Sequence, residues 1–513
     1  MEHMEHIEPY LNIRSNAISD ESVFKIDYPE IDCTNPPGIN QTAGGEILFK
    51  TSNSATWYLP SKSYMLIEGQ IQLNGAPITT TTLPTGNVLS YPGITFVNNG
   101  LMHMFNTVTY KLNGTILETF TWAGITTTIN NILTKDKDYQ AIESMWYPDG
   151  YTTNADFSND GYVKRWQAVL NTSGGAANLY KFGCLVPLAN IFNFCDYNNK
   201  VNYGMLHELS FFRQSTDNYA LHGSITGNQS YVNGLPHYSN VMAQISAGAG
   251  GVAFAPVPGN YSIFLTKFKW ILPNVTPSDD VKITLNEIFV KKENQQIAFL
   301  NKRLDSQQNL GAGSNTFNWN LSNTTGLSKI RFIVIGVQLF NRSSPITNAG
   351  AGLSPVNATG APAVAGWPTT LAFAAQNNNI GNNSILYNNS VFDAIDISTL
   401  YAYVDNVRYP IQEQQSSILV NTTEKWYESY KDFRKYYSNS NRDDSAMDYF
   451  QFQKNPLYVI DVSKQPNRIA NSTVTTSINL TLNNPLPNPA TAYVVTYFDT
   501  CYNLKGTEIT NKF

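Results

Sequence analysis

The sequence predicts a predominantly β chain that is divided into two large domains. The chain has 513 residues, and a single hydrophobic core stops growing near about 250–300 residues, so that longer chains divide. Apolar and polar residues alternate with a period of two in many segments, which is the spacing of a strand with one buried face. Helical spacing is clear in one segment and weak in another. Together, these observations favour two β-rich units.

The alternation is clearest in residues 65–73, where every second side chain is expected to face a core while Glu68 faces outward. Residues 108–112 repeat the pattern and run into Asn113-Gly114, a pair that tolerates the positive φ angles of a tight hairpin turn. The returning strand is therefore expected to follow at once. Strands are expected at 115–121, 264–272, 317–321, 330–339, 400–409, 474–482 and 492–498.

The strongest helical signal covers residues 424–437, where four aromatic residues recur at helical spacing and form one apolar stripe. The stripe consists of Trp426, Tyr430, Phe433 and Tyr437. Asn421 and Glu424 have the spacing of a capping pair. We favour packing of the stripe on the helix's own sheet over a binding face for an aromatic or membrane partner. A weaker helix is expected at 124–133, so that each half of the chain carries one helix after a strand pair.

Long connections rich in Gly, Pro, Asn, Thr and Ala separate the strands. They lie at 76–93, 148–179, 214–260 and 343–389. Loops beyond about 12–15 residues are uncommon in compact domains, whereas many strands joined by long loops are typical of jelly rolls, in which eight strands form two facing sheets. The expected fold class is therefore all-β: two consecutive eight-stranded jelly rolls with a few short helices and long loops.

The domain boundary is expected in the charged stretch from Lys291 to Gln296. This stretch lies between a strand predicted to end near Val290 and the apolar run that begins at Ile297. The resulting division is an N-terminal arm at 1–45, a first jelly roll at 46–291 and a second jelly roll at 292–513.

Charge is scarce in this chain. Charged residues make up 14% of the sequence, against roughly 25% in typical soluble proteins. A polar, weakly charged surface suits a molecule whose flanks lie against neighbours, but an Asn-rich genome bias gives the same composition, and both interpretations stay open. The net charge of −5 argues against wrapping of nucleic acid, which needs a basic face. No sequence-specific nucleic-acid partner is therefore expected.

Targeting and redox signals are weak. Residues 1–6 are polar and acidic, unlike a secretory signal, and no stretch reaches the roughly 18 consecutive apolar residues of a membrane span. The four cysteines, Cys33, Cys184, Cys195 and Cys501, form no Cys-x-x-Cys pair. Free thiols in a reducing compartment are the expectation.

Motifs for metal-dependent catalysis are absent from the sequence. His207-Glu208 is the one His-Glu neighbour pair, and it lacks the second histidine at helical spacing that a zinc protease requires. Because it lies in an alternating segment, 205–212, we expect a strand histidine. The acidic pairs Asp279-Asp280 and Asp443-Asp444 are expected to be solvated loop charge.

Glycine-rich pieces at 248–251 and 350–352 lack the Lys-Ser/Thr that follows a phosphate loop, and no Gly-x-Ser-x-Gly nucleophile motif is present. The sequence therefore predicts no catalytic, cofactor-binding or metal-ligating residue and no cofactor.

Several segments follow one another in an order that is specific as a set, although no single segment is diagnostic. They are Trp57–Gly69, Phe96–Gly100, Tyr110–Gly114, Val186–Leu188, Leu400–Pro410, the aromatic helix at 424–437 and Val459–Gln465. In this order and spacing the chain resembles the double jelly-roll major capsid proteins of Polinton-like viruses, adintoviruses and virophages. The resemblance covers most of the chain.

The resemblance implies a structural protein of the virion without enzymatic activity. Three copies would form a homotrimer of six jelly rolls, a pseudo-hexameric block that tiles the icosahedral shell of a small double-stranded DNA virus. Implied partners are the chain itself, in trimer and trimer–trimer contacts, together with a penton protein and minor capsid proteins. Assembly would take place inside the host cell. The long connections at 214–260 and 343–389 depart from a clean match.

Two other functions compete with this interpretation. Jelly rolls also occur in carbohydrate-binding modules, where Trp146 and Trp367 could stack on sugars if they are exposed. A cupin-type enzyme would need several histidines around one metal, whereas the six histidines of this chain are scattered along it.

Overall fold

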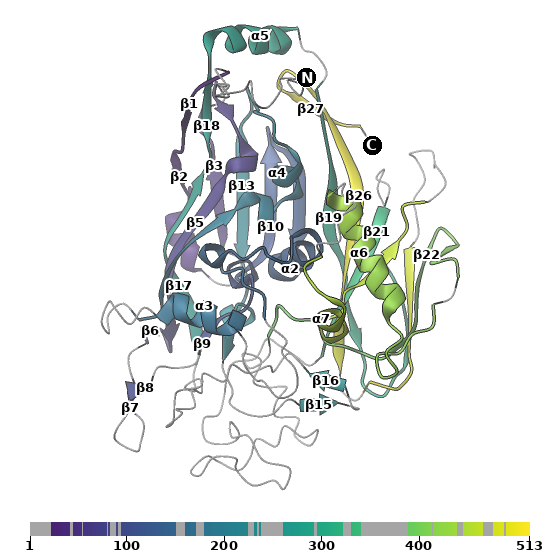
Figure 1. Ribbon diagram of the computed structural model, residues 1–513. Coiled ribbons are helices and arrows are strands. Elements are labelled where there is room, and N and C mark those ends of the chain that lie inside the picture. Colours follow the sequence, from purple (N-terminus) through teal and green to yellow (C-terminus); the bar gives the residue numbers. More distant parts are fainter. Residues whose placement is uncertain are drawn as a thin grey trace, which may run out of the picture.

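In the computed structural model of the chain, the described residues form two β-sandwiches that lie side by side (Figure 1). The structure describes residues 22–41, 45–53, 55–78, 81–82, 89–90, 94–149, 160–170, 179–223, 230–232, 235–237, 260–291, 295–321, 330–339, 388–412, 414–438, 445–464, 476–486 and 489–512. The predicted connection at 343–389 and the acidic pair Asp443-Asp444 lie outside these residues, apart from 388 and 389.

The first sandwich consists of two facing antiparallel sheets. One sheet has the order β12 (Lys181–Pro187), β5 (Tyr64–Leu73), β17 (Tyr261–Ile271) and β2 (Glu30–Asp32), with β6 (Ala76–Pro77) paired to the end of β5. The other has the order β11 (Thr115–Thr121), β10 (Phe105–Leu112), β13 (His207–Arg213) and β3 (Glu46–Lys50). The segment 1–45, predicted as an arm, thus contributes β2 to this sandwich.

The second sandwich is built in the same way. One sheet has the order β19 (Gln295–Leu310), β26 (Ala490–Lys505), β21 (Ile330–Leu339) and β24 (Tyr458–Asp461), with β27 (Glu508–Asn511) paired to β26. The other has the order β20 (Thr316–Asn320), β25 (Thr476–Leu482), β22 (Ile397–Val404) and β23 (Val407–Tyr409).

Both sandwiches have the same strand order. If the eight main strands of each sandwich are numbered along the described chain, the two sheets of either sandwich read 1-8-3-6 and 2-7-4-5. In this arrangement the first strand pairs with the last, and each later strand folds back beside an earlier one, which is the topology of a jelly roll. The predicted fold class, two consecutive jelly rolls, is therefore confirmed.

Helices and minor strands lie around this framework. The described helices are α1 (Gly100–His103), α2 (Ala123–Thr134), α3 (Asp160–Leu170), α4 (Asn193–Tyr197), α5 (Asp279–Val290), α6 (Glu424–Ser438) and α7 (Tyr449–Lys454). In one minor sheet, β18 (Asn274–Pro277) lies between β1 (Val23–Asp27) and β4 (Trp57–Tyr58). The other minor sheets pair β9 (Ile94–Phe96) with β14 (Leu221–Gly223), β7 (Thr81–Thr82) with β8 (Leu89–Ser90), and β15 (Ser230–Val232) with β16 (Leu235–His237). In Figure 1, α2 lies between the two sandwiches and α5 lies at one end of the molecule.

The predicted hairpin and helices are present. Asn113 and Gly114 have φ angles of 47° and 79° and join β10 to β11. The helix predicted at 424–437 is α6, and the weaker one at 124–133 is α2. Asn421, however, does not cap α6: it has a φ of 61°, and its Oδ1 atom accepts a hydrogen bond from Gln453.

The prediction for the end of the first half was wrong. Val290 ends helix α5 and not a strand, and Asp279 and Asp280 occupy the first turn of this helix and not a loop. Residues 281–286 alternate in a way that is typical of a strand, whereas in the helix Ile283 and Val290 are exposed. Two carboxylates favour a helix at its N-terminus because they face the positive end of its dipole.

Two strand predictions also need correction. Residues 400–409 form the hairpin β22–β23 and not one strand, because Asp405 and Asn406 take positive φ angles and reverse the chain. The alternation predicts a core position for Phe264, which is instead exposed. A bulge between Leu265 and Lys267 shifts the register of β17 against β5, and a shift of one residue turns a side chain to the other face.

The connection predicted at 148–179 contains helix α3. Among its buried side chains, the apolar residues Tyr162, Trp166 and Val169 have the i, i+4 and i+7 spacing of one helical face. These three residues carry a helical signal within a polar segment, and they pack into the core of the first sandwich.

Each sandwich has its own hydrophobic core, but each core also contains side chains from the other half of the chain. Ile297, Phe299, Tyr502 and Leu504, at one end of β19 and β26, pack into the first core. Conversely, the isoleucines of helix α2 and Trp146, all from the first half, pack into the second core. The isoleucines are Ile125, Ile129 and Ile132.

We expect the halves to be insoluble when they are separated after residue 291, the predicted domain boundary. Separation would expose, on both fragments, the side chains that pack into the core of the other half, and large apolar patches cause aggregation. Expression of 1–291 and 292–513 apart and together, followed by measurement of the soluble fraction, tests this expectation. Co-expression should restore solubility. Two soluble monomeric fragments would contradict it.

Candidate functional site

The histidine that the sequence singled out is a buried strand residue. His207 lies in β13 and is fully buried, and its Nδ1 atom lies 2.7 Å from the hydroxyl of Tyr110. Burial lowers the pKa of His207 to about 3. Glu208 faces away and pairs with Lys50 at 3.2 Å. Among the described residues, no group of three His, Cys, Asp or Glu side chains is placed to hold a metal ion.

We expect the buried histidines to make the fold sensitive to acid. Burial lowers the pKa of His103, like that of His207, from 6.5 to about 3. Because the unfolded chain binds these protons at higher pH than the folded chain does, their contribution to stability is complete above pH 6.5 and is lost as the pH falls toward 3. Each histidine should cost about 1.6 kcal/mol of stability between pH 6.5 and pH 5.

Urea unfolding at both pH values measures this loss. A His207→Gln variant, which keeps a hydrogen-bonding side chain but cannot titrate, should lose less stability on acidification than the unaltered chain. Equal losses in both proteins would show that His207 is not responsible.

The other residues singled out by the sequence do not converge on a site. All four cysteines are buried free thiols, and burial raises the pKa of Cys184 to about 12, which disfavours the reactive thiolate. Trp146, a proposed sugar-stacking residue, is buried in the second core. Trp367 and the glycine-rich pieces at 248–251 and 350–352 lie outside the described residues.

One cavity of about 290 Å³ opens between the two halves of the described chain. Its walls come from Lys135, Asp136 and Tyr147 of the first half and from Met447 and Asn455 of the second. Lys135 is the one cation here with a perturbed pKa, and burial lowers it.

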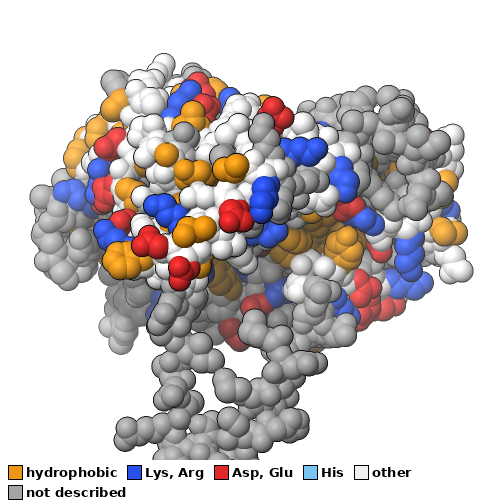
Figure 2. All heavy atoms as spheres, turned by 90° about the horizontal axis from the view of Figure 1, so that it is seen from above, with side chains coloured by type: hydrophobic (Ala, Val, Ile, Leu, Met, Phe, Trp, Pro, Cys, Tyr) orange, Lys and Arg blue, Asp and Glu red, His pale blue; other side chains and the backbone are white. Residues whose placement is uncertain are grey.

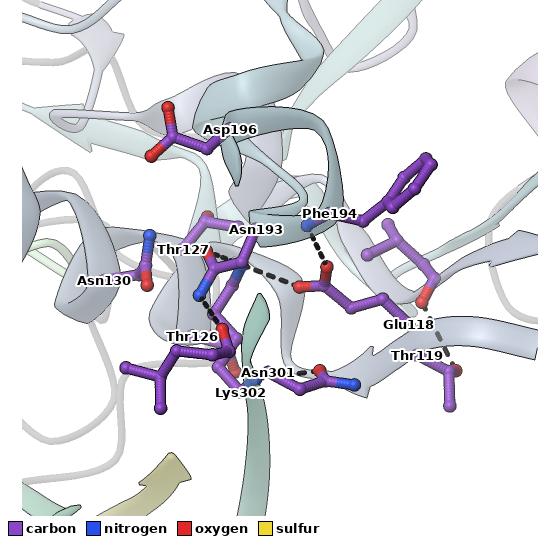
Figure 3. A network of polar contacts seen from close by, with 12 residues as sticks. Glu118, Thr119, Thr126, Thr127, Asn130, Asn193, Phe194, Asp196, Asn301 and Lys302 are labelled. Carbon is purple, nitrogen blue, oxygen red and sulfur yellow. Dashed lines mark hydrogen bonds and ion pairs between the residues drawn. The ribbon is translucent and has the colours of Figure 1, made fainter. Parts of the chain in front are cut away.

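The most developed polar arrangement lies between the sandwiches and is shown in Figure 3. The Nζ atom of Lys302, on β19, lies 2.8 Å from the Oε1 atom of Glu118, on β11. It also lies 2.8 Å from the Oδ1 atom of Asn193, on α4. Lys302, Glu118 and Asn193 are fully buried. Sequence reasoning missed this cluster because its members lie far apart along the chain and none belongs to a motif.

Helix α6 adds a second group of contacts across this boundary. The Tyr430 hydroxyl donates to the carbonyl of Ile132 at 3.1 Å, and the Tyr437 hydroxyl donates to Asp196 at 2.7 Å. Arg434 binds the carbonyl of Thr134 and the carboxylate of Asp136. The aromatic stripe therefore packs on α6's own sheet and, through its hydroxyls, ties that sheet to the first half.

A third group is centred on Asp149. Its Oδ1 atom accepts from Arg165 at 2.6 Å, and its Oδ2 atom accepts from Asn388 at 2.5 Å. Asn389 donates to the carbonyl of Tyr219 at 3.2 Å. Like the Lys302 and α6 contacts, this group holds one half against the other.

Apolar side chains are exposed at several places. On β1, Phe24 is 81% exposed and Ile26 is 41% exposed, and β1 is the edge strand of its sheet. Helix α5, at the same end of the molecule, exposes Ile283 and Val290. Figure 2, a view onto this end, shows hydrophobic side chains scattered among acidic and basic ones. None of the helices in the described part of the chain is long and apolar enough to cross a membrane.

Comparisons with known proteins agree with the topology. A family model described as a double jelly roll-like domain matches residues 356–501. No curated protein matches the sequence. A chain of the cryo-EM structure of the Sputnik virophage superposes with a TM-score of 0.52 at 11% identity, covering 100% of this chain and 93% of that one.

Two further solved structures lie just below that level of similarity. The mavirus major capsid protein has a TM-score of 0.49 at 9% identity, covering 99% of this chain and 95% of its own. The Faustovirus major capsid protein has a TM-score of 0.48 at 7% identity, covering 96% and 92%. The strand order, the family model and the Sputnik superposition together identify this chain as a double jelly-roll protein.

Proposed function

We propose that this chain is the major capsid protein of a small double-stranded DNA virus of the virophage or Polinton-like type. The observation that carries the proposal is the repeated 1-8-3-6 and 2-7-4-5 strand order in two sandwiches fixed side by side. Three copies of such a chain present six similar sandwiches around one axis. A closed ring of this kind is a pseudo-hexameric homotrimer, which can tile a shell as a hexagon does.

The distribution of polar chemistry supports a structural role. The polar clusters around Lys302 and Asp149 are buried, and with the contacts of Arg434 they join the two sandwiches. We therefore propose no enzymatic activity. The weak surface charge suits flanks that lie against neighbouring copies, because few charges need to be desolvated on contact.

We further propose that trimers contact one another in an icosahedral shell, with a penton protein at the vertices and minor capsid proteins as additional partners. The chain would then be located in the virion after assembly inside the host cell. The proposed division is an arm at 1–45, whose strand β2 completes a sheet of the first sandwich, a first jelly roll at 46–291 and a second at 292–513, with α5 directly before the boundary.

Light scattering coupled to size-exclusion chromatography, followed by negative-stain imaging of the purified chain, tests the proposal. We expect a mass of three chains and hexagonal particles of uniform size. A stable monomer that binds an oligosaccharide would instead support a carbohydrate-binding module. A monomer without such binding and without shells would contradict the capsid proposal.

We expect the exposed edge strand β1 to take part in contacts between subunits. An edge strand presents unpaired backbone groups together with its side chains, and an apolar one is a template for pairing with another chain. Replacement of both Phe24 and Ile26 by Asp should therefore lower the yield of trimers at least tenfold while the melting temperature of the monomer stays the same.

Phe450→Asp is the matched control, because Phe450 is similarly exposed but lies on helix α7 and not on a sheet edge. Normal trimers in the double variant would exclude β1 as a contact. Equal loss of trimers in the control would show that added charge, and not the edge strand, is responsible.

A further inference from the structure

The cluster of Lys302, Glu118 and Asn193 combines an amine, a carboxylate and a side-chain amide in one buried place (Figure 3). The amine nitrogen of Lys302 lies 2.8 Å from the carboxylate and 2.8 Å from the amide oxygen. All three side chains come from different elements, β19, β11 and α4. An amine and an amide carbonyl held at this distance are the two reactants of a transamidation.

The three groups are held in place by further hydrogen bonds. The Nδ2 atom of Asn193 donates to the carbonyl of Leu300 at 2.8 Å, which fixes the plane of the amide. The other oxygen of Glu118 accepts from the backbone N–H of Phe194 at 3.0 Å. Both bonds leave the Lys302 amine between the carboxylate and the amide carbonyl. Such fixed proximity can replace much of the entropic barrier of a reaction between two molecules.

The cluster is buried, and both aromatic rings and polar side chains lie near it, the latter including Thr127, Asn130 and Asp196 (Figure 3). The Lys302 amine lies 5.0 Å from the centre of the Phe120 ring, and Phe192 and Phe194, both buried, lie on α4 or directly before it. In a buried site the charged ammonium form of a lysine is costly, and this cost favours the neutral amine. Burial lowers the pKa of Lys302 in this way. A neutral amine is the form that can act as a nucleophile.

We propose that Lys302 and Asn193 become joined by an autocatalytic isopeptide bond, with Glu118 as the proton carrier. The lone pair of Nζ attacks Cγ of Asn193, the Nζ–Cγ bond forms, and the Cγ–Nδ2 bond breaks. Glu118 carries two protons in turn from Nζ to Nδ2, which leaves as ammonium. The carboxylate of Glu118 is regenerated, so charge and atoms balance and no oxidant or cofactor is consumed.

The bond would link α4 of the first half to β19 of the second half covalently. It would close a loop from residue 193 to residue 302 that contains α5 and the predicted domain boundary. The inference rests on the geometry of the cluster and not on the proposed capsid function. The two can therefore fail separately.

Mass spectrometry of the intact, denatured chain tests the proposal. We expect a mass lower than that of the sequence by about 17 Da, one ammonia. Digestion with trypsin should yield a branched peptide in which residues 182–200 are joined to residues 293–303, because a modified Lys302 is not cleaved. A chain that keeps its full mass after prolonged incubation, and yields both peptides unbranched, would overturn the proposal.

Three variants separate the roles of the residues. Lys302→Arg removes the nucleophile and should restore the full mass. Glu118→Gln keeps a side chain of the same shape but cannot carry protons, and it should slow formation of the bond at least tenfold. Lys50→Arg is the control, because Lys50 pairs with Glu208 near the surface, and it should keep the lower mass.

Loss of ammonia can also come from cyclisation of an asparagine alone. In that case Lys302→Arg would show the same low mass and no branched peptide would form, and this outcome would refute the isopeptide bond. The mass and the peptides of the unaltered chain decide whether the bond exists, so a variant that fails to fold leaves that result unchanged.

Discussion

Replacement of Trp426 by alanine is expected to destabilise the second jelly roll by about 3–5 kcal/mol, as truncation of large buried aromatic residues does. Trp426 is 1% exposed, its indole N–H donates to the hydroxyl of Ser416 at 3.2 Å, and its ring lies edge-on to Tyr458 at 5.8 Å. The substitution leaves a cavity and removes the donor to the Ser416 hydroxyl, which keeps its own hydrogen bond to the carbonyl of Ile397. Chemical unfolding of the two proteins at one pH measures the difference.

The oligomeric state of the same sample shows whether the stripe also serves as a subunit contact. We expect a lower stability and, wherever the variant is folded, normal trimers. Phe450→Ala, which removes an exposed ring, should change stability by no more than about 0.5 kcal/mol. A Trp426→Ala protein that unfolds like the unaltered chain but does not form trimers would place the stripe in an interface and contradict its burial.

Replacement of Asp149 by alanine is expected to cost about 3–5 kcal/mol, because removal of one partner leaves a buried charge uncompensated. Arg165, the partner, is fully buried, and it also donates to the carbonyl of Phe96 at 2.9 Å. The substitution further removes the acceptor of Asn388, which joins the two halves. Thermal and urea unfolding measure the loss.

The exposed pair of Lys25 and Asp27 provides the comparison. Asp27→Ala should cost less than about 1 kcal/mol, because exposed ion pairs are screened by solvent. A double variant in which both Asp149 and Arg165 are replaced by apolar residues should recover part of the loss. If Asp149→Ala were as mild as Asp27→Ala, the buried pair would contribute little, and the contact between the sandwiches would depend on its apolar side chains.

The sequence predicted the sandwiches well because alternation reports burial of one face. The sequence also predicted β21, in which both faces are buried. Residues 332–339 are buried without interruption, because one side of this sheet faces its partner sheet and the other side faces α6. Helix α6 was predictable because its stripe is sharply amphipathic. The pattern of α5 did not predict its structure, because Ile283 and Val290 are apolar but exposed.

The buried polar clusters were beyond prediction for a different reason. Glu118, Asn193 and Lys302 are ordinary residues in sequence, and only the packing of β11, α4 and β19 brings them together. The bulge that turns Phe264 outward could not be predicted from the sequence either. An inserted residue changes which side chains of a strand face the core, but it does not change the composition of the strand. Local patterns report which element forms, whereas contacts distant in sequence depend on the completed topology.

The exchange of side chains between the two cores has a consequence for synthesis. A ribosome releases the chain from its N-terminus, and domains generally fold in that order. The first jelly roll, however, needs Tyr502 and Leu504 to complete its core, and these residues lie on β26, the last of the eight main strands of the second jelly roll. The nascent first half must therefore wait, with part of its apolar surface uncovered, until β26 has left the ribosome. Neither half can commit to its final packing before the other is made.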